Sequence, residues 1–370
     1  MWEQKKKVLI QVRDLRIGNG IASCIMNYFE YTATHGYSID FLLNRNIASP
    51  YVDLVEKYGS KIYVLPHDTG KPDKENRKYI RRVVTAEYDI FHANISGLNA
   101  LEGLRIAKKA GIAIRIYHAH NPKEISSIKA KIRSLIYETP SVLLANQYVA
   151  CSHYAGDSIF GNRKYTVLTN AMDTSRFSYD QVARERLRKE LDIQDKFVVG
   201  VVGRLAEQKN PYFILDVFSE FKKKENNSVL IWVGDGDLRS SIEDYINEKK
   251  LDDSVKLLGT RTDVNKLYSA MDVFLLPSKF EGLGLVFIEA QISGLECFGS
   301  DHVPVDVEIT EKMHRIKLKE PAMKWASIMN ESRNNSAPRK DYKEEALSAG
   351  YEIKNEASSL LKIYTEFLEN

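Results

Sequence analysis

Short apolar runs alternate with helical patterns along most of the 370-residue chain, and this alternation decides the fold class. Two strands joined through a helix run in the same direction, so repeated alternation predicts an α/β protein with doubly wound parallel sheets. The expected strands of the first half are Val8–Val12, Ile39–Leu43, Ile62–Leu65, Asp89–Ala93, Ile112–Tyr117, Leu143–Cys151 and Tyr165–Leu168. Those of the second half are Phe197–Val202, Val229–Val233, Val255–Leu258, Val273–Leu276 and Cys297–Gly299.

The chain is long enough for two domains, because 370 residues exceed the usual size of one. A charged helical run separates the two series of strands and places the boundary within 177–196. We therefore expect an N-terminal domain over residues 1–178 and a C-terminal domain over 179–351. Residues 352–370 are expected to form an amphipathic closing helix, with apolar positions at Ile353, Ala357, Leu360, Leu361, Tyr364 and Leu368.

The composition is that of a globular protein, with 44% hydrophobic and 28% charged residues. No run approaches the roughly 18–20 apolar residues that a membrane span requires. The first apolar run, Val8–Val12, is also too short for the core of a signal peptide. The three cysteines, Cys24, Cys151 and Cys297, are few and widely spaced, which favours reduced core residues. These features predict a cytoplasmic location.

Charge is distributed unevenly along the chain. The first 180 residues hold 25 Lys and Arg against 17 Asp and Glu, whereas the remainder is net acidic. Within the basic half, residues 122–144 combine cations with apolar residues at helical spacing. Such a helix either packs one face on the core or rests on an anionic bilayer, so a peripheral position on the inner face of the plasma membrane stays open. We expect no nucleic-acid partner. The cations are Lys123, Lys129, Lys131 and Arg133, and the apolar residues are Ile125, Ile128, Ile132, Leu135 and Ile136.

The stretch 275–289 predicts a buried strand, a glycine turn and the start of a helix. Gly282 and Gly284 supply the turn, and the helix is expected to begin near Leu285. Free backbone N–H groups and the positive end of the helix dipole make such a turn a site for anions.

Two carboxylates flank this turn, Glu281 before it and Glu289 about one helical turn inside the helix. Because they would repel a phosphate that they touched, we interpret them as acceptors for the vicinal hydroxyls of a sugar. The hypothesis is a nucleotide-sugar site. The alternative is an ordinary strand–turn–helix connection with two solvated glutamates.

A second turn follows the first strand of the C-terminal half. Gly203 lets the chain turn, while Arg204 and Lys209 place two cations beside it. A planar guanidinium and a compact ammonium suit a diphosphate leaving group, and neutralising the charge that grows on that group would lower the transition state. Asn210 is expected to cap the following helix. Two ordinary surface cations remain the alternative.

Glycines and histidines follow strands of the N-terminal half. Gly18 and Gly20 lie in the first strand–helix turn, where backbone could approach a phosphate or a sugar. His118 and His120 follow a predicted strand and could bind sugar hydroxyls or handle a proton. We expect the two to point to opposite sides, which argues against a shared metal, and we interpret His92 as a packing residue.

The segment 234–237 contains an Asp-x-Asp pair of the kind that holds a divalent metal on nucleotide sugars in another architecture. Here it directly follows a strand and opens a helix. We interpret its glycines as turn residues and Asp237 as an acid at a helix start. The sequence therefore predicts no metal and no other cofactor.

Taken in order, these motifs resemble the retaining glycosyltransferases of family 4, and among them the polysaccharide-assembly type. The resemblance rests on Gly-Arg-x4-Lys from Gly203, Val-Gly-Asp-Gly from Val233, Pro-Ser-x-x-Glu-Gly-x-Gly from Pro277, Glu-x7-Glu from Glu281 and the segments 151–152, 169–177 and 288–301. The chain departs from the family at Gly18-Asn-Gly20, where many members have adjacent glycines, at Ala171, where a glycine is usual, and at 295–297, where Leu-Pro is commoner.

The resemblance implies the GT-B fold, in which two Rossmann-like domains face each other across a cleft and a C-terminal helix crosses back to the N-terminal domain. It also implies that the N-terminal domain binds the acceptor and the C-terminal domain the nucleotide sugar. By position, Arg204 and Lys209 match the diphosphate pair, Glu281 the acid on the donor sugar and Glu289 the acid on the ribose. Contacts with base, sugar or phosphate are further implied for Arg261, Gly203, Gly282, Leu283, Gly284, Leu285, Gly18, Gly20 and His118, with His120 as a weaker match.

The reaction implied is metal-independent transfer of a hexosyl unit with retention, expected from a UDP-linked donor to a lipid-linked or growing surface polysaccharide. Attack from the front face needs no enzyme nucleophile, and none is evident. Two alternatives stay open. One is a nucleotide-sugar epimerase on the same architecture, and the other is a catalytically silent partner subunit.

Overall fold

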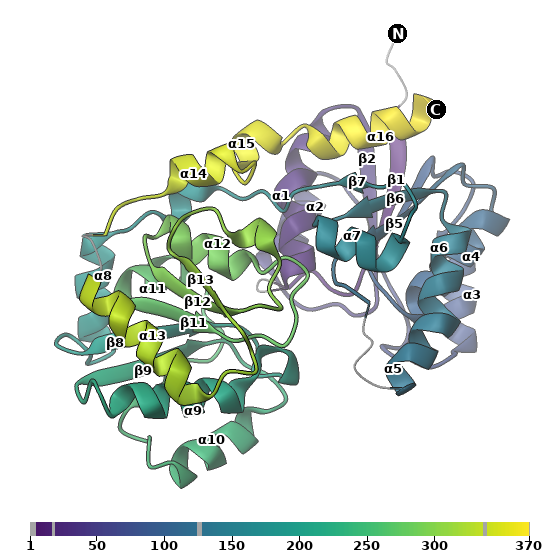
Figure 1. Cartoon of the computed structure of the whole chain (residues 1–370). Helices are drawn as coiled ribbons and strands as arrows, with labels where there is room; N and C mark the ends of the chain where they lie inside the picture. Colours follow the sequence, from purple (N-terminus) through teal and green to yellow (C-terminus); the bar gives the residue numbers. More distant parts are fainter. Residues whose placement is uncertain (1–4, 17–18, 124–127, 336–338, 370) are drawn as a thin grey trace. The chain divides into compact units, whose positions relative to one another are not determined.

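A computed structural model describes residues 5–16, 19–123, 128–335 and 339–369, and it divides into two compact units (Figure 1). The N-terminal unit comprises Met1–Met172 together with Ile353–Asn370, and the C-terminal unit is Asp173–Glu352. The units thus divide a few residues before the boundary that the sequence placed after residue 178.

The N-terminal unit is built on a seven-stranded sheet in the order β3-β2-β1-β4-β5-β6-β7. All of its pairings are parallel, as the alternation predicted. The strands are β1 Lys6–Val12, β2 Tyr37–Leu43, β3 Ile62–Val64, β4 Ile90–Ala93, β5 Ile114–Ala119, β6 Gln147–Ala150 and β7 Thr166–Val167.

Helices connect these strands. The prediction that a strand spans Leu143–Cys151 is wrong for its first residues. Leu143 and Leu144 end a helix, and β6 begins only at Gln147. Asn146 separates the two elements because its side chain accepts from Arg115 N and donates to Ala113 O, each at 2.8 Å. The helices are α1 Gly20–Thr34, α2 Pro50–Lys57, α3 Lys74–Val83, α4 Leu98–Lys109, α5 Ile128–Arg133, the π-helix η1 Ser134–Glu138, α6 Thr139–Leu144 and α7 His153–Phe160.

The C-terminal end of the chain returns to the N-terminal unit as expected, but it forms two helices with a break at residues 357–358, where the sequence predicted one. It forms α15, Ile353–Glu356, and α16, Ser359–Glu369. Leu360 and Tyr364 of α16 are fully buried in the core that α1 and the central strands build. This burial places one face of α16 inside the N-terminal unit.

The C-terminal unit contains a six-stranded parallel sheet in the order β10-β9-β8-β11-β12-β13. Its strands are β8 Phe197–Val202, β9 Ser228–Val233, β10 Val255–Leu257, β11 Val273–Leu276, β12 Glu296–Ser300 and β13 Met313–Ile316. Its helices are α8 Gln181–Glu190, α9 Pro211–Lys222, α10 Arg239–Glu248, α11 Val264–Ala270, α12 Leu285–Ile292, α13 Ala322–Asn335 and α14 Lys343–Ser348, with 3₁₀ turns at Thr174–Phe177, Glu207–Lys209 and Val305–Val307.

The edge strand β13 was not expected from the sequence. Its two middle residues, His314 and Arg315, are polar and only half-buried, so no apolar run marks it. The three cysteines form no disulfide bond and are buried, as expected for core residues.

Candidate functional site

The turn between β11 and α12 leaves backbone donors at the start of a helix. Gly284 caps α12 with φ +90°, a left-handed conformation that favours glycine. Gly282 and Leu283 are buried in the turn. The amides of Leu283, Gly284 and Leu285 donate to no other residue in the described part of the chain. These N–H groups can therefore serve an oxygen of a ligand.

Glu281 is buried beside this turn and carries a close cation. Lys209 Nζ and Ser278 Oγ each donate to its Oε1 at 2.6 Å, while Gln208 Nε2 lies 3.5 Å from Oε2. The Lys209 and Glu281 side chains are only 13% and 6% exposed. A buried carboxylate held in this way keeps lone pairs on Oε2 for a hydroxyl group.

The loop after β8, which carries both predicted cations, is fixed by a second glycine loop after β9. A Cβ at Gly234 would lie 2.2 Å from Gly203 O, and one at Gly236 would lie 2.4 Å from Leu205 O. Trp232 Nε1 also donates to Gly203 O at 2.9 Å. Only glycine allows the two backbones to approach so closely, so the pair predicted as turn residues also braces the cation loop.

Within that loop, Arg204 is exposed and forms no ion pair with another described residue. Asn210 occupies the cap position of α9, but its side chain does not cap the helix. Its backbone is left-handed, with φ 59°, and its Nδ2 donates instead to Pro277 O at 3.3 Å. Asn210 thereby ties the loop to the end of β11, and Arg204 remains available to an anion.

Arg261, implied to contact the base, is bound by carboxylates in this structure. Its Nε and Nη2 donate to Asp263 at 2.8 Å, and Nη2 also donates to Glu190 at 3.2 Å. The hydrogen bond to Asp263 raises the pKa of the Arg261 guanidinium above its ordinary value. A contact with the base would have to compete with these partners, and it stays a prediction.

Glu289 lies inside α12 and is partly buried. Burial raises the pKa of Glu289, and the hydrogen bond that Tyr268 Oη donates to its Oε2 at 2.7 Å opposes that rise. Its Oε1 receives no hydrogen bond from the described residues, so this oxygen can accept from a ligand hydroxyl.

Of the two glycines predicted in the first strand–helix turn, Gly18 lies outside the described residues. Gly20 is the exposed first residue of α1, and a Cβ there would meet no atom within 4 Å. The turn is instead held by Asn19, whose Oδ1 accepts from Ile21 N at 3.2 Å and whose Nδ2 donates to Asp14 at 3.0 Å. Burial would raise the pKa of Asp14, but hydrogen bonds led by that of Asn19 lower it below its ordinary value.

The expectation that His118 and His120 point to opposite sides is wrong. Their rings stack with centroids 3.9 Å apart, because residues two apart on an extended chain project to the same face. His92 belongs to the same group, since its Nε2 lies 3.2 Å from His118 Nδ1. Burial lowers the pKa of His92 and of His120 to about 3 and that of His118 well below its ordinary value. Within the described ranges, no group of three or more His, Cys, Asp or Glu side chains could hold a metal ion.

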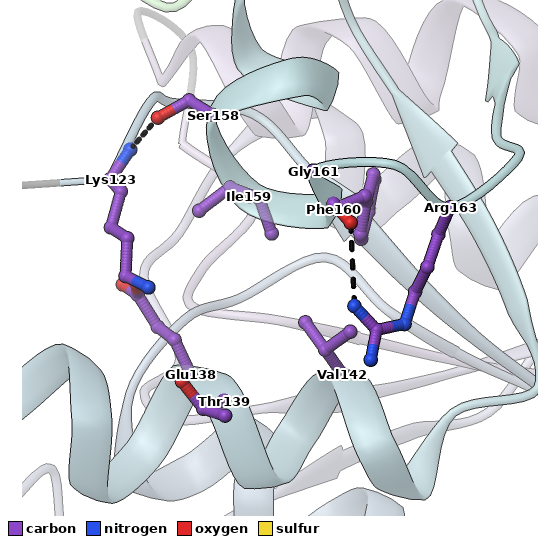
Figure 2. Close-up of a pocket in the computed structure, with 9 residues that line it drawn as sticks. All are labelled: Lys123, Glu138, Thr139, Val142, Ser158, Ile159, Phe160, Gly161 and Arg163. Carbon is purple, nitrogen blue, oxygen red and sulfur yellow. Dashed lines mark hydrogen bonds between the residues drawn. The ribbon is translucent and has the colours of Figure 1, made fainter.

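The N-terminal unit contains a cavity of about 280 Å³ (Figure 2). Lys123 and Arg163 reach it from opposite sides, with Ile159 and Val142 between them. None of the residues predicted for the donor site lines it. The lining residues are Lys123, Glu138, Thr139, Val142, Ser158, Ile159, Phe160, Gly161 and Arg163.

Next to Lys123 in the chain, α5, η1 and α6 turn large apolar side chains toward solvent. Ile128 is 77% exposed and Leu135 68%, and Ile132, Ile136 and Leu143 are exposed as well. At Ile128, Ile132, Leu135 and Ile136, the apolar stripe that the sequence located is therefore not a core face. Ile125 of that stripe lies outside the described residues. Among the helices that the structure describes, none combines the length and apolar character of a membrane span.

Several partners of the predicted residues were missed in the sequence. Ser278 and Gln208 stand inside recognised motifs, and the spacing of Ser278 to Glu281 could have suggested its contact. Tyr268 and Tyr364 carry no such signal, because their partners Glu289 and His92 lie 21 and 272 positions away in the sequence. Asp14 lies only five positions from its partner Asn19, but no motif marks that pair.

Comparison with known proteins gives a consistent result. Residues 183–348 match the family described as glycosyl transferases group 1. Over 376 aligned residues, covering 98% of this chain and 97% of the relative, the chain is 27% identical to a Bacillus subtilis protein named as glycosyltransferase EpsF. It is 32% identical over 231 residues, 58% of each chain, to an Escherichia coli enzyme named UDP-Gal:alpha-D-GlcNAc-diphosphoundecaprenol alpha-1,3-galactosyltransferase.

Solved structures share the architecture of the whole chain. The crystal structure of Anabaena HepE in complex with UDP and glucose superposes with a TM-score of 0.77 at 18% identity, covering 98% of this chain and 100% of HepE. The crystal structure of WaaG, a glycosyltransferase of lipopolysaccharide biosynthesis, does so with a TM-score of 0.70 at 12% identity, covering 95% and 94%. At these identities the likeness establishes the two-domain α/β fold.

Proposed function

Residues 183–348 form a glycosyl transferases group 1 domain within a GT-B fold, and on that premise we propose that this glycosyltransferase moves a hexosyl unit from a UDP-linked sugar to a lipid-linked or growing polysaccharide. The name of the E. coli relative contains a UDP-linked sugar and a diphosphoundecaprenol-linked sugar. HepE was crystallised with UDP and glucose. These names support the choice of donor and acceptor class.

The observation that carries the proposal is the group of complementary donors and acceptors where β8 and β11 end. Arg204 and the N-terminal amides of α12 offer positive charge and free N–H groups to a diphosphate. Glu281 and Glu289 each keep an oxygen for sugar hydroxyls. Lys209, 2.6 Å from Glu281, orients that carboxylate and adds positive charge beside the leaving group.

The reaction that suits these groups is transfer with retention. The bond between the anomeric carbon and the β-phosphate oxygen breaks, and the acceptor oxygen bonds to the same face of that carbon. The acceptor proton passes to the departing phosphate, so no enzyme nucleophile is required. Arg204, Lys209 and the amides of Leu283, Gly284 and Leu285 stabilise the negative charge that grows on the diphosphate, without a metal ion.

We also propose that the protein binds an anionic bilayer. The exposed stripe of Ile128, Ile132 and Leu135 lies beside the exposed cations Lys129 and Lys131. Apolar side chains of this kind insert between headgroups, while cations bind the phosphates. We take this surface to hold the enzyme at the membrane, where a lipid-linked acceptor resides.

The proposed transfer is tested by incubating the full chain with labelled UDP-hexoses and polyprenyl-diphosphate sugars, with and without acceptor. Transfer that requires acceptor is the expected result. Conversion of the donor sugar without acceptor would identify an epimerase instead. Neither transfer nor donor turnover with any UDP- or GDP-hexose would favour a silent subunit and contradict the proposal.

The membrane surface is tested by sedimentation with phosphatidylglycerol and phosphatidylcholine vesicles. The double variant Ile132→Ser/Leu135→Ser should lose most binding to anionic vesicles. Val182→Ser, which removes an even more exposed apolar residue from α8, should not lose it. Binding that is indifferent to lipid charge and to the double variant would remove this part of the proposal.

A further inference from the structure

A line of hydrogen-bonding groups leads from the closing helix to His118. Tyr364 Oη lies 2.7 Å from His92 Nδ1, and His92 Nε2 lies 3.2 Å from His118 Nδ1. All three side chains are buried within the N-terminal unit. At the end of the line, His118 Nε2 is buried without a hydrogen-bond partner among the described residues. Strain, a catalytic role, or binding of a water, an ion or a ligand accounts for such an atom in a native protein.

The direction of this line follows from counting donors and acceptors. A buried phenol needs an acceptor for its hydrogen, and His92 Nδ1 is the one that the described surroundings offer to Tyr364. With Nδ1 accepting, the neutral His92 ring carries its proton on Nε2 and donates to His118 Nδ1. The neutral His118 ring must then carry its own proton on Nε2. In the reverse direction, the buried hydroxyl hydrogen of Tyr364 would have no acceptor.

The surroundings keep both rings neutral and in place. Burial lowers the pKa of His92 to about 3 and the pKa of His118 well below its ordinary value. His120 stacks on His118 at 3.9 Å, and its Nε2 is 2.8 Å from Asn94 Oδ1, an oxygen that can only accept. The His118 ring is thereby held between His92 on one side and His120 on the other.

We propose that Tyr364 and His92 are positioning residues that fix His118 as its Nε2–H tautomer, so that His118 offers a hydrogen-bond donor to an oxygen of a ligand. This inference rests on the proposed function for the identity of the ligand. It assigns His118 the role of a neutral donor, because its Nδ1 lone pair is occupied and its Nε2 is protonated. His118 is then not the base that accepts the proton of the acceptor.

The tautomer is measured directly by two-bond ¹⁵N–¹H spectra of the full-length chain labelled with ¹⁵N-histidine, with His118→Asn and His92→Gln for assignment. We expect His118 as the Nε2–H form in the wild type and a mixture of tautomers in Tyr364→Phe. An Nδ1–H or doubly protonated His118 at neutral pH in the wild type would overturn the proposal. This measurement needs no substrate, so it decides the tautomer even if the proposed transfer fails.

Enzyme kinetics distinguish a positioning role of Tyr364 from a role in packing alone. Tyr364→Phe should lower kcat/KM about five- to tenfold, the range expected for one misdirected hydrogen bond. The matched control is Tyr37→Phe, because the Tyr37 ring packs 5.6 Å from that of Tyr364 and its hydroxyl contacts only Thr365 Oγ1 among the described residues, at 3.1 Å. It should change kcat/KM less than twofold.

A second pair of variants keeps the test valid if Tyr364→Phe folds poorly. In His92→Gln, the side-chain amide can still donate from Nε2 to His118 Nδ1, so kcat/KM should stay within about threefold of the wild type. In His92→Leu no donor remains, and kcat/KM should fall to that of His118→Asn. Equal kcat/KM for the Gln and Leu variants, or for the Tyr364 and Tyr37 variants, would overturn the positioning role.

Discussion

Two groups of polar residues in this chain are built in contrasting ways. Where β8 and β11 end, Lys209 and Glu281 form a buried ion pair from two turns that both carry sequence motifs. In the N-terminal unit, His92 and His118 form a neutral group that is completed by Tyr364, 272 positions away from His92. The first group depends on charge and on glycine packing, and the second on the direction of hydrogen bonds between buried side chains. They should therefore fail under different perturbations, and the predictions below test that difference.

The largest effect is expected from neutralising the carboxylate of the charged group. Glu281→Gln should lower kcat by about a hundredfold or more, because Lys209 would lose its partner and the sugar its strongest acceptor. The matched control is Lys279→Ala, which breaks an exposed pair with Glu207 of the same 2.6 Å length between the same two turns. It should leave kcat within twofold. Transfer assays on both variants decide the point, and a Glu281→Gln enzyme of near wild-type activity would contradict the role of the ion pair.

Glycine packing is the second feature that distinguishes the charged group. Gly234→Ala should destabilise the C-terminal unit by about 2–4 kcal/mol, because Gly234 has φ +136° and its new Cβ would collide with Gly203 O. Gly20→Ala, in the N-terminal turn, meets no atom within 4 Å and should change stability by less than about 0.5 kcal/mol. Chemical denaturation followed by fluorescence and circular dichroism measures both. Equal stabilities would show that the glycine loop does not brace the cation loop.

The neutral group should instead respond to pH. The folded-state pKa of His92 is about 3, against about 6.5 when unfolded, so below pH 6.5 the unfolded chain binds a proton that the folded chain does not. Its contribution to stability is fully present above pH 6.5 and is lost as the pH falls toward 3, by about 2 kcal/mol at pH 5. His118 acts in the same direction.

Denaturation curves between pH 7 and pH 5 test this dependence. His92→Gln should flatten it, whereas His35→Gln, which removes an exposed histidine from the end of α1, should leave it unchanged. A wild-type chain whose stability is constant over this range would show that the histidine group is not neutral because of burial.

The contrast also explains how much the sequence could predict. Apolar runs located the central strands of both sheets because each strand is buried on both faces, as in β8 and β9. Glycines and charged residues in motifs located the cation loop and the turn before α12. The partners of these motif residues follow from strand order, since β8 and β11 are neighbours in the sheet.

What the sequence missed depends on contacts without a local pattern. β13 lacks an apolar run, and Leu143–Leu144 extend an apolar run across the end of a helix. The histidine group was missed because residues two apart were taken to face opposite sides, and because no motif marks Tyr364. The stripe from Ile128 to Leu143 is buried only if other elements pack against it. Helical periodicity alone does not decide whether they do.

The smallest effect is expected from a change at Tyr268, which forms a hydrogen bond with Glu289. Here a neutral donor orients a carboxylate, since Tyr268 Oη donates to Glu289 at 2.7 Å and opposes the rise in its pKa that burial causes. Tyr268→Phe should therefore raise the KM for the nucleotide sugar about fivefold with kcat nearly unchanged, as expected when a contact made equally in ground and transition states is weakened. Tyr245→Phe, which removes a similar 2.8 Å hydrogen bond to Asp216 on the surface of the same unit, is the control and should leave KM unchanged. A fall in kcat with constant KM would instead place Glu289 near the reacting bond, because only an interaction that strengthens in the transition state alters kcat alone.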